Sequence, residues 1–265
     1  MVAMFEAYFD DSGTDSSSEI AIAACYVSTK RGWDEFIREW ECARNQEGFL
    51  EKFHMADFRA PRNQAHKPYC DWDNTKKDHV YARLAKIINE NKRIGIACAV
   101  PKQLYDDLVP ERLRRHHGGH YPFAVWKCII KLERWREKSL ISSPMRLVFD
   151  WEEPGSLKRK EICQIFDTME DGWAKRLGME DEDSYSFEHG AQFKPLQGAD
   201  ILAWQMNNHM RRIFPGPDKA ESAREDFKLL REDQEMNLVF FTEENLRAWV
   251  KKIEDDEAAH GVIYK

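Results

Sequence analysis

The chain has 265 residues, of which 42% are hydrophobic and 12% aromatic, enough to bury the core of one large domain or two small ones. Such a chain is not expected to be disordered, although 33% of its residues are charged. The formal net charge of −7 argues against a general nucleic-acid coat protein, because affinity for phosphate backbones comes from Lys and Arg. It does not exclude a local basic groove.

The cysteines and the N-terminus indicate the compartment. No two of the six cysteines form a CxxC pair, and several lie in apolar runs, which is typical of reduced thiols in a cytoplasmic protein. The acidic N-terminal sequence lacks the apolar stretch of a signal peptide, and the longest apolar run, residues 20–27, is too short to span a bilayer. We therefore expect no membrane association. Four cysteines are predicted to be unpaired and mostly buried: Cys25, Cys98, Cys128 and Cys163.

The first elements alternate between strands and helices. Apolar and polar residues alternate over residues 4–10, which predicts a half-buried strand, and residues 11–16 are typical of a turn. The elements expected next are a strand at 20–28, helices at 32–44 and 78–91, and a strand at 93–100.

The second half is expected to continue the alternation. Strands are predicted at 145–150, 185–188 and 238–241, and helices at 122–138, 156–177, 195–213, 218–231 and 242–254. Three antiparallel strands followed by α/β units form the ribonuclease H-like order, so we predict an α/β fold with such a mixed sheet. The inserted helices fall at about 30–92. The break at Pro215-Gly216-Pro217 divides a domain at 1–214 from a C-terminal helical appendage at 215–265, packed on the same domain.

Three aspartates lie where this fold would gather carboxylates. Asp10 and Asp150 close the first and fourth strands, which would be neighbours, and Asp200 lies one turn into the helix at 195–213, within an apolar stretch. Mg²⁺ and Mn²⁺ prefer oxygen ligands, and two such ions can activate a water and stabilise the leaving oxygen of a phosphodiester. We interpret the three as catalytic metal ligands. The alternative is that each is an ordinary turn or helix-end acid.

A second candidate pair is His54 and Asp57. They are three residues apart, so on a helical turn they share one face. There they would bind metal or carry a proton. The alternative is an ion-paired surface turn.

Basic residues gather at 112–120 around two glycines. Glycines let a backbone approach phosphate closely, so Arg114, Arg115 and His120 are candidate phosphate contacts. A solvated basic loop is the alternative.

Two motifs and a strand between them resemble a known family, the domain of unknown function 3800 family. Its members open with a D-E-S-G-like motif, matched by Asp10-Asp11-Ser12-Gly13, and carry a Q-x-A-D helix motif, matched by residues 197–200. An apolar strand ending at Asp150 lies between the two motifs. The resemblance covers residues 5 to about 213 and implies a ribonuclease H-like fold with a nuclease-type metal site.

The resemblance also suggests roles for individual residues. The family's usual Glu is Asp11 here, one methylene shorter, so Asp11 ranks below Asp10 and stands with His54 and Asp57 as a second-rank ligand or proton carrier. Gln197 would orient Asp200 or contact substrate, and Ser12 is a further candidate substrate contact.

The leading hypothesis is a Mg²⁺- or Mn²⁺-dependent nuclease or phosphodiesterase acting on nucleic acid or a nucleotide. Two rivals are kept: a catalytically silent binding or effector module of a bacterial defence system, and a metal-dependent hydrolase of small nucleotides. The sequence does not indicate an oligomeric state.

Overall fold

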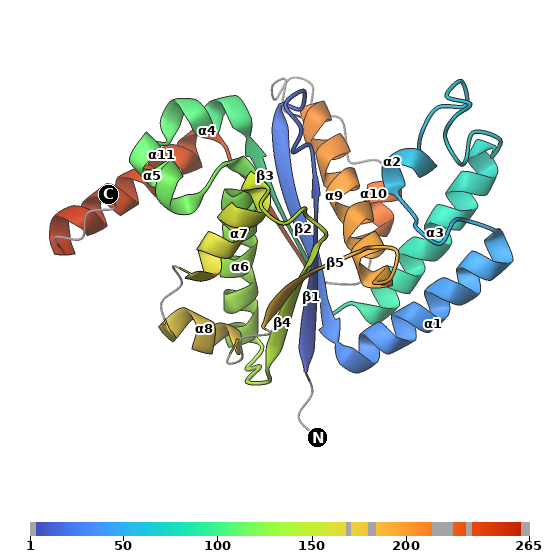
Figure 1. The fold of residues 1–265 in the computed structure, drawn as a ribbon, viewed down its shortest axis with the longest axis horizontal. Helices are drawn as coiled ribbons and strands as arrows, with labels where there is room; N and C mark the ends of the chain where they lie inside the picture. The colour runs from blue at the N-terminus through green and yellow to red at the C-terminus, as the bar shows by residue number, and fades with distance from the viewer. Residues whose placement is uncertain (1–3, 168–170, 180–183, 214–224, 232–234, 261–265) are drawn as a thin grey trace.

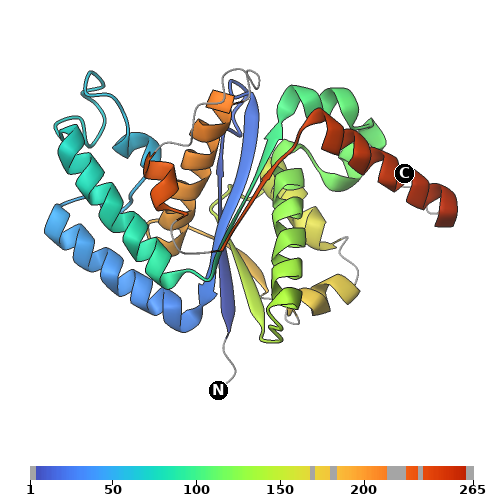
Figure 2. The ribbon, with the colours of Figure 1, turned by 180° about the vertical axis from the view of Figure 1, so that it is seen from behind.

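A mixed β-sheet runs through the centre of the protein, with a layer of helices on each side (Figures 1 and 2). The structure is a computed structural model that describes residues 4–167, 171–179, 184–213, 225–231 and 235–260. In these ranges the sheet has six strands in the order β5-β4-β1-β2-β3-β6. Their bounds are β1 Phe5–Ser12, β2 Ile20–Thr29, β3 Ile94–Pro101, β4 Met145–Asp150, β5 Tyr185–Glu188 and β6 Met236–Phe240.

The sheet contains both antiparallel and parallel strand pairs. β1, β2 and β3 pair antiparallel in succession, whereas β4 pairs parallel with β1, β5 with β4, and β6 with β3. Parallel neighbours need a crossover connection, and a helix supplies it between each pair. The predicted α/β class with a mixed sheet is confirmed, as is the prediction that the first and fourth strands are neighbours.

Alternate residues of each strand point to opposite sides of the sheet and build two separate cores. We name the two sides after the helices α6 (His120–Lys138) and α9 (Lys194–Ile213), which cross them. Phe9 and Phe149 point to the α6 face, whereas Tyr8 and Val148 point to the α9 face. The helices on the α6 face are α4 Lys102–Leu108, α5 Glu111–His117, α6 His120–Lys138, α7 Leu157–Asp167, α8 Asp171–Leu177 and α11 Glu243–His260.

The α9 face carries the helices inserted between β2 and β3. Its helices are α1 Lys30–Glu47, α2 Met55–Phe58, α3 Asn74–Asn91, α9 Lys194–Ile213 and α10 Glu225–Leu229. The hydroxyl of Thr29 caps α1 by accepting from the Gly32 N–H, and Asp73 caps α3 by accepting from the Lys76 N–H. Helices α1 and α3 lie between β2 and β3 in the chain, where helices were predicted at 32–44 and 78–91.

Four expectations need correction. β1 continues through Asp11 and Ser12, where a turn was predicted, because both residues pair with β2. The predicted basic loop is largely the helix α5. Helix α4 was not predicted. The strand predicted at 238–241 in the C-terminal segment is β6, and it joins the central sheet beside β3, which the description of this segment as a helical appendage did not anticipate.

Part of the C-terminal prediction lies outside the described residues. The predicted helix at 218–231 appears only as α10 within them, and residues 214–224 are not described. The predicted helix at 156–177 corresponds to α7 and α8, with 168–170 not described.

The cysteine prediction is confirmed, since all six cysteines lie in described residues and are free thiols. Cys25, Cys98 and Cys128 are buried in the core of the α6 face, and Cys163 is half-buried. Within the described ranges, no helix has both the length and the apolar composition needed to cross a bilayer.

Candidate carboxylate site

Asp10, near the end of β1, and Asp150, the last residue of the neighbouring strand β4, point to the same side of the sheet. The last register pair between β1 and β4 is Phe9 with Phe149, and their stacked rings lie 4.9 Å apart on the α6 face. Because side chains alternate, the next residue on each strand points to the α9 face. Parallel strands lie about 4.8 Å apart, so the two carboxylates come from adjacent positions.

Asp200 approaches this strand edge from α9. Its side chain is buried, with 7% of the residue exposed. Asp10, Asp150 and Asp200 all line one cavity of about 30 Å³. That volume is enough for about one or two water-sized groups. The remaining lining residues are Lys52, Phe53, His54, Gly190, Leu196 and Gln197.

Each carboxylate is fixed through one oxygen by a backbone N–H. The Asp11 N–H donates to Oδ1 of Asp10 at 2.7 Å, and the Gly190 N–H donates to Oδ1 of Asp150 at 3.2 Å. The Met55 N–H donates to Oδ2 of Asp200 at 2.6 Å. These bonds come from β1, from the segment after β5 and from the start of α2, so three separate segments orient the three acids.

The cavity disfavours negative charge on its three acids. Burial, then the charges of Asp200 and Asp11, hold the pKa of Asp10 well above its ordinary value. Burial also raises the pKa of Asp150. Burial raises the pKa of Asp200 to about 6, although His54 and the Met55 N–H act in the opposite direction. A cation placed among these oxygens would relieve both the burial penalty and the mutual repulsion.

The donor set has the chemistry of a Mg²⁺ or Mn²⁺ site, because it consists of carboxylate oxygens. Its spacing is not that of a formed site: among the described residues, no three His, Cys, Asp or Glu side chains are grouped closely enough to hold a metal ion. Binding one ion would therefore require the three side chains to move toward each other.

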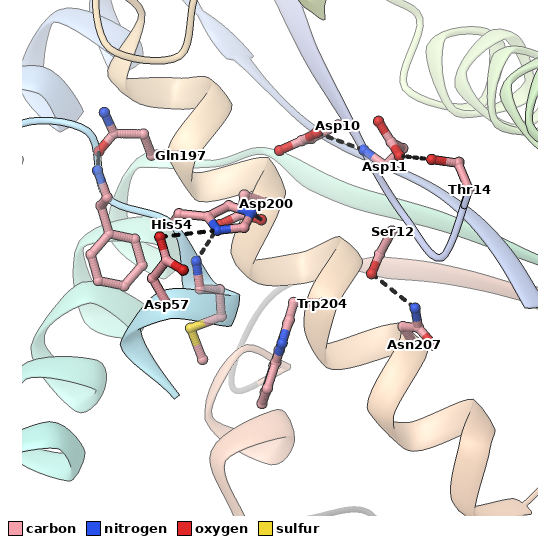
Figure 3. Close-up of polar contacts among 12 residues, drawn as sticks. Asp10, Asp11, Ser12, Thr14, His54, Asp57, Gln197, Asp200, Trp204 and Asn207 are labelled. Atoms are coloured by element: carbon pink, nitrogen blue, oxygen red, sulfur yellow. Dashed lines mark hydrogen bonds and ion pairs between the residues drawn. The ribbon is translucent and has the colours of Figure 1, made fainter. Parts of the chain in front are cut away.

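His54 and Asp57 lie beside Asp200, as Figure 3 shows. Nε2 of His54 is 3.7 Å from Oδ1 of Asp200, and its Nδ1 is 3.7 Å from Oδ2 of Asp57. Lys67 donates to the other oxygen of Asp57 at 2.5 Å. The structure thus brings His54 to the cavity, while Asp57 is already paired with Lys67 and contacts the cavity only through His54.

Gln197 joins three segments around the cavity. Its Oε1 accepts from the Phe53 N–H and the Trp40 Nε1–H, both at 3.2 Å. Its Nε2 donates to the carbonyls of Glu51 and Gly190, both at 2.8 Å. The amide group is therefore fully used inside the protein, and Gln197 positions the segments that hold Asp150 and Asp200.

Asp11 and Ser12 are separated by the alternation of β1. Asp11 points to the α6 face, where Lys158 contacts it at 2.5 Å, so it does not line the cavity. Ser12 points to the α9 face and accepts from Nδ2 of Asn207 at 2.9 Å (Figure 3). Gly13 has φ of +69°, and a Cβ there would lie 2.2 Å from the Ile20 carbonyl oxygen. The motif thus lies in β1 as far as Ser12 and ends in a tight turn at Gly13, beside α9.

The basic residues predicted as phosphate contacts lie elsewhere. Arg114 and His120 both contact Oδ1 of Asp106, at 3.1 and 3.0 Å. Arg115 lies 3.7 Å from Glu111. They belong to α5 and the start of α6 on the other face, and none of them lines the cavity. Lys52, which does line it, was missed, because an exposed lysine has no signal in the sequence.

Comparison with protein-family models, with curated proteins and with solved structures finds no match.

Proposed function

We propose that this chain is a divalent-metal-dependent nuclease or phosphodiesterase in which Asp10, Asp150 and Asp200 bind Mg²⁺ or Mn²⁺. The observation that carries the proposal is their shared cavity, reached from two adjacent strand ends and from α9. Raised pKa values at buried carboxylates are typical of functional sites. When bound, the metal would activate a water and stabilise the leaving oxygen of a phosphodiester.

We further propose a ribonuclease H-like fold and membership in the domain of unknown function 3800 family. The strand order β5-β4-β1-β2-β3, with β2 alone antiparallel to both of its neighbours, supports the fold. The two motifs support the family because Asp10 and Asp200, one from each, line the same cavity. Free thiols in the core fit a cytoplasmic protein.

Two further residues at the cavity, Lys52 and His54, have specific roles in this proposal. Lys52 brings a positive charge to the cavity, where a substrate phosphate would sit. His54 lies beside Asp200, half exposed, where it can exchange a proton with a bound substrate or product. Nucleic acid or a nucleotide is therefore the proposed substrate.

A catalytically silent binding module is the second candidate. The observation that favours it is the spacing of the acids, which do not form a ready metal site in the described structure. A silent module would keep the fold and bind a partner without needing a cation.

The test is a cleavage assay on single- and double-stranded DNA and RNA and on mononucleotide diesters, with Mn²⁺, Mg²⁺ or EDTA. We expect metal-dependent cleavage of at least one substrate, lost in Asp10→Asn and kept in Asp34→Asn, an exposed aspartate on α1. Absence of cleavage, together with no metal-induced change in melting temperature, would favour the silent module. Cleavage of mononucleotide diesters alone would favour the small-nucleotide hydrolase.

A further inference from the structure

A second charged cluster lies at the same edge of the sheet, on the α6 face. It consists of Asp11, Glu152 and Lys158. Asp11 follows Asp10 and so points to the opposite side. Lys158, on α7, places its ammonium 2.5 Å from Oδ1 of Asp11 and in direct contact with Oε1 of Glu152.

The cluster is more enclosed than an ordinary surface ion pair. The exposed fractions of the side chains are 22% for Lys158, 19% for Asp11 and 23% for Glu152. The ammonium also lies 4.7 Å from the ring centroid of Tyr121, which attracts a cation. Carboxylates from two segments and a ring on α6 therefore hold the ammonium of Lys158 in one place.

The charged cluster and the proposed metal centre are built from the same chain segments. The two carboxylates that hold Lys158 come from the same chain segments as Asp10 and Asp150: the end of β1 and the residues after β4. Two-metal phosphodiesterases need a second cation close to the first, held by neighbouring carboxylates. Here the ammonium of Lys158 already contacts the carboxylate pair Asp11 and Glu152, which follow Asp10 and Asp150 in the chain, and a metal ion bound by that pair would have to displace it.

We propose that Lys158 is a built-in cation that takes the place of a second metal ion, so that the chain binds a single divalent ion, at Asp10, Asp150 and Asp200. The proposal rests on the proposed function for the position of that ion. Lys158 is a positioning residue that neutralises Asp11 and Glu152. Its replacement by an uncharged side chain should open a second ion site between them.

The test counts Mn²⁺ ions per chain by isothermal titration calorimetry, with equilibrium dialysis as a second count. Lys158→Met keeps most of the apolar stem and removes the charge. Lys160→Met is the matched control, because Lys160 is exposed on the same helix. We expect about one ion for the wild type and for Lys160→Met, and about two for Lys158→Met.

Two outcomes overturn the inference and leave the proposed centre intact: two ions in the wild type, or one ion in Lys158→Met. If the wild type binds none and Lys158→Met binds one, Lys158 does hold a cation's place, and the three-aspartate centre is wrong. No binding by any form refutes both. Lys158→Gln repeats the count if the methionine variant does not fold, and the wild-type count needs no variant.

Discussion

Asp10 and Asp150 are the first residues of their strands beyond the stacked pair Phe9 and Phe149, and both turn away from that pair toward α9. The stacked Phe9–Phe149 pair of the α6-face core is thus followed directly, on both strands, by a carboxylate that lines the cavity. The packing of the two phenylalanines fixes the strand register that brings the two carboxylates together.

Asp150→Asn should abolish cleavage and leave the fold intact. Asparagine keeps the oxygen that accepts from the Gly190 N–H but loses the negative charge that a divalent ion needs. Because burial raises the pKa of Asp150, its ionised form is disfavoured, so the variant should melt at the same or a higher temperature without metal. Mn²⁺ should raise the melting temperature of the wild type and of Asp107→Asn, an exposed control, but hardly that of Asp150→Asn. An equal shift in all three would place the ion elsewhere.

The stability of the metal-free protein should depend on Asp200. The folded pKa of about 6 exceeds the unfolded value of about 3.9. Between these values the folded state binds more protons, so stability falls as pH rises through this window, by about 3 kcal/mol in total. In urea unfolding, Asp200→Asn should equal the wild type near pH 4 and exceed it by about that amount at pH 7.5. A constant difference across this range would contradict the assignment.

Gln197→Ala should destabilise the protein more than Gln205→Ala does. Both residues are buried on α9, with 2% and 1% exposed, so the cavities left behind are comparable. The Gln197 amide makes four hydrogen bonds, whereas that of Gln205 makes one, to Tyr81, and its Oε1 has no hydrogen-bond partner. Unpaired buried groups cost about 1–3 kcal/mol each, so we expect a difference of about 2 kcal/mol or more in the free energy of unfolding. An equal loss of unfolding free energy in the two variants would show that the segments around the cavity do not depend on the hydrogen bonds of Gln197.

Lys52→Gln should weaken substrate binding more than turnover. Lys52 is the lysine that lines the cavity, and a phosphate contact adds affinity that depends on salt. We expect KM for a cleaved polynucleotide to rise by about three- to tenfold, with a smaller change in kcat and a weaker dependence of KM on salt. Lys30→Gln, at the start of α1, serves as the control. If both variants keep the wild-type KM, the substrate does not pass over Lys52.

Local patterns were sufficient to predict most of the sheet. The strand that ends at Asp150 was predicted with its observed bounds, because β4 is almost entirely apolar and stops at an acid. The predicted end of β1 was two residues too early, since Asp11 and Ser12 favour a turn locally and only pairing with β2 keeps them extended. That error hid the alternation that separates Asp11 from Asp10.

The shared cavity of Asp10, Asp150 and Asp200 was expected from their places in the topology, but their neighbours could not be predicted. The Met55 N–H reaches Asp200 across 145 residues of sequence, and the Phe53 N–H reaches Gln197 across 144. Such contacts depend on how the insertion packs against α9, which no short pattern encodes. The predicted phosphate contacts at Arg114 and His120 failed to reach the cavity for a related reason: Asp106, on a helix that was not predicted, pairs with both.

The parallel pairing of β6 with β3 has a consequence for how the protein reaches its folded state. Met236 pairs with Gly95, so the outermost strand on this side is contributed by a segment about 140 residues farther along the chain. Closing a loop of that length has an entropic cost and slows the step in which the pair forms. Until it forms, the backbone N–H and C=O groups along β3 are open to pairing with another chain. The protein should therefore be most prone to aggregate during refolding, and a peptide spanning residues 236–240 should suppress that aggregation by occupying the β3 edge.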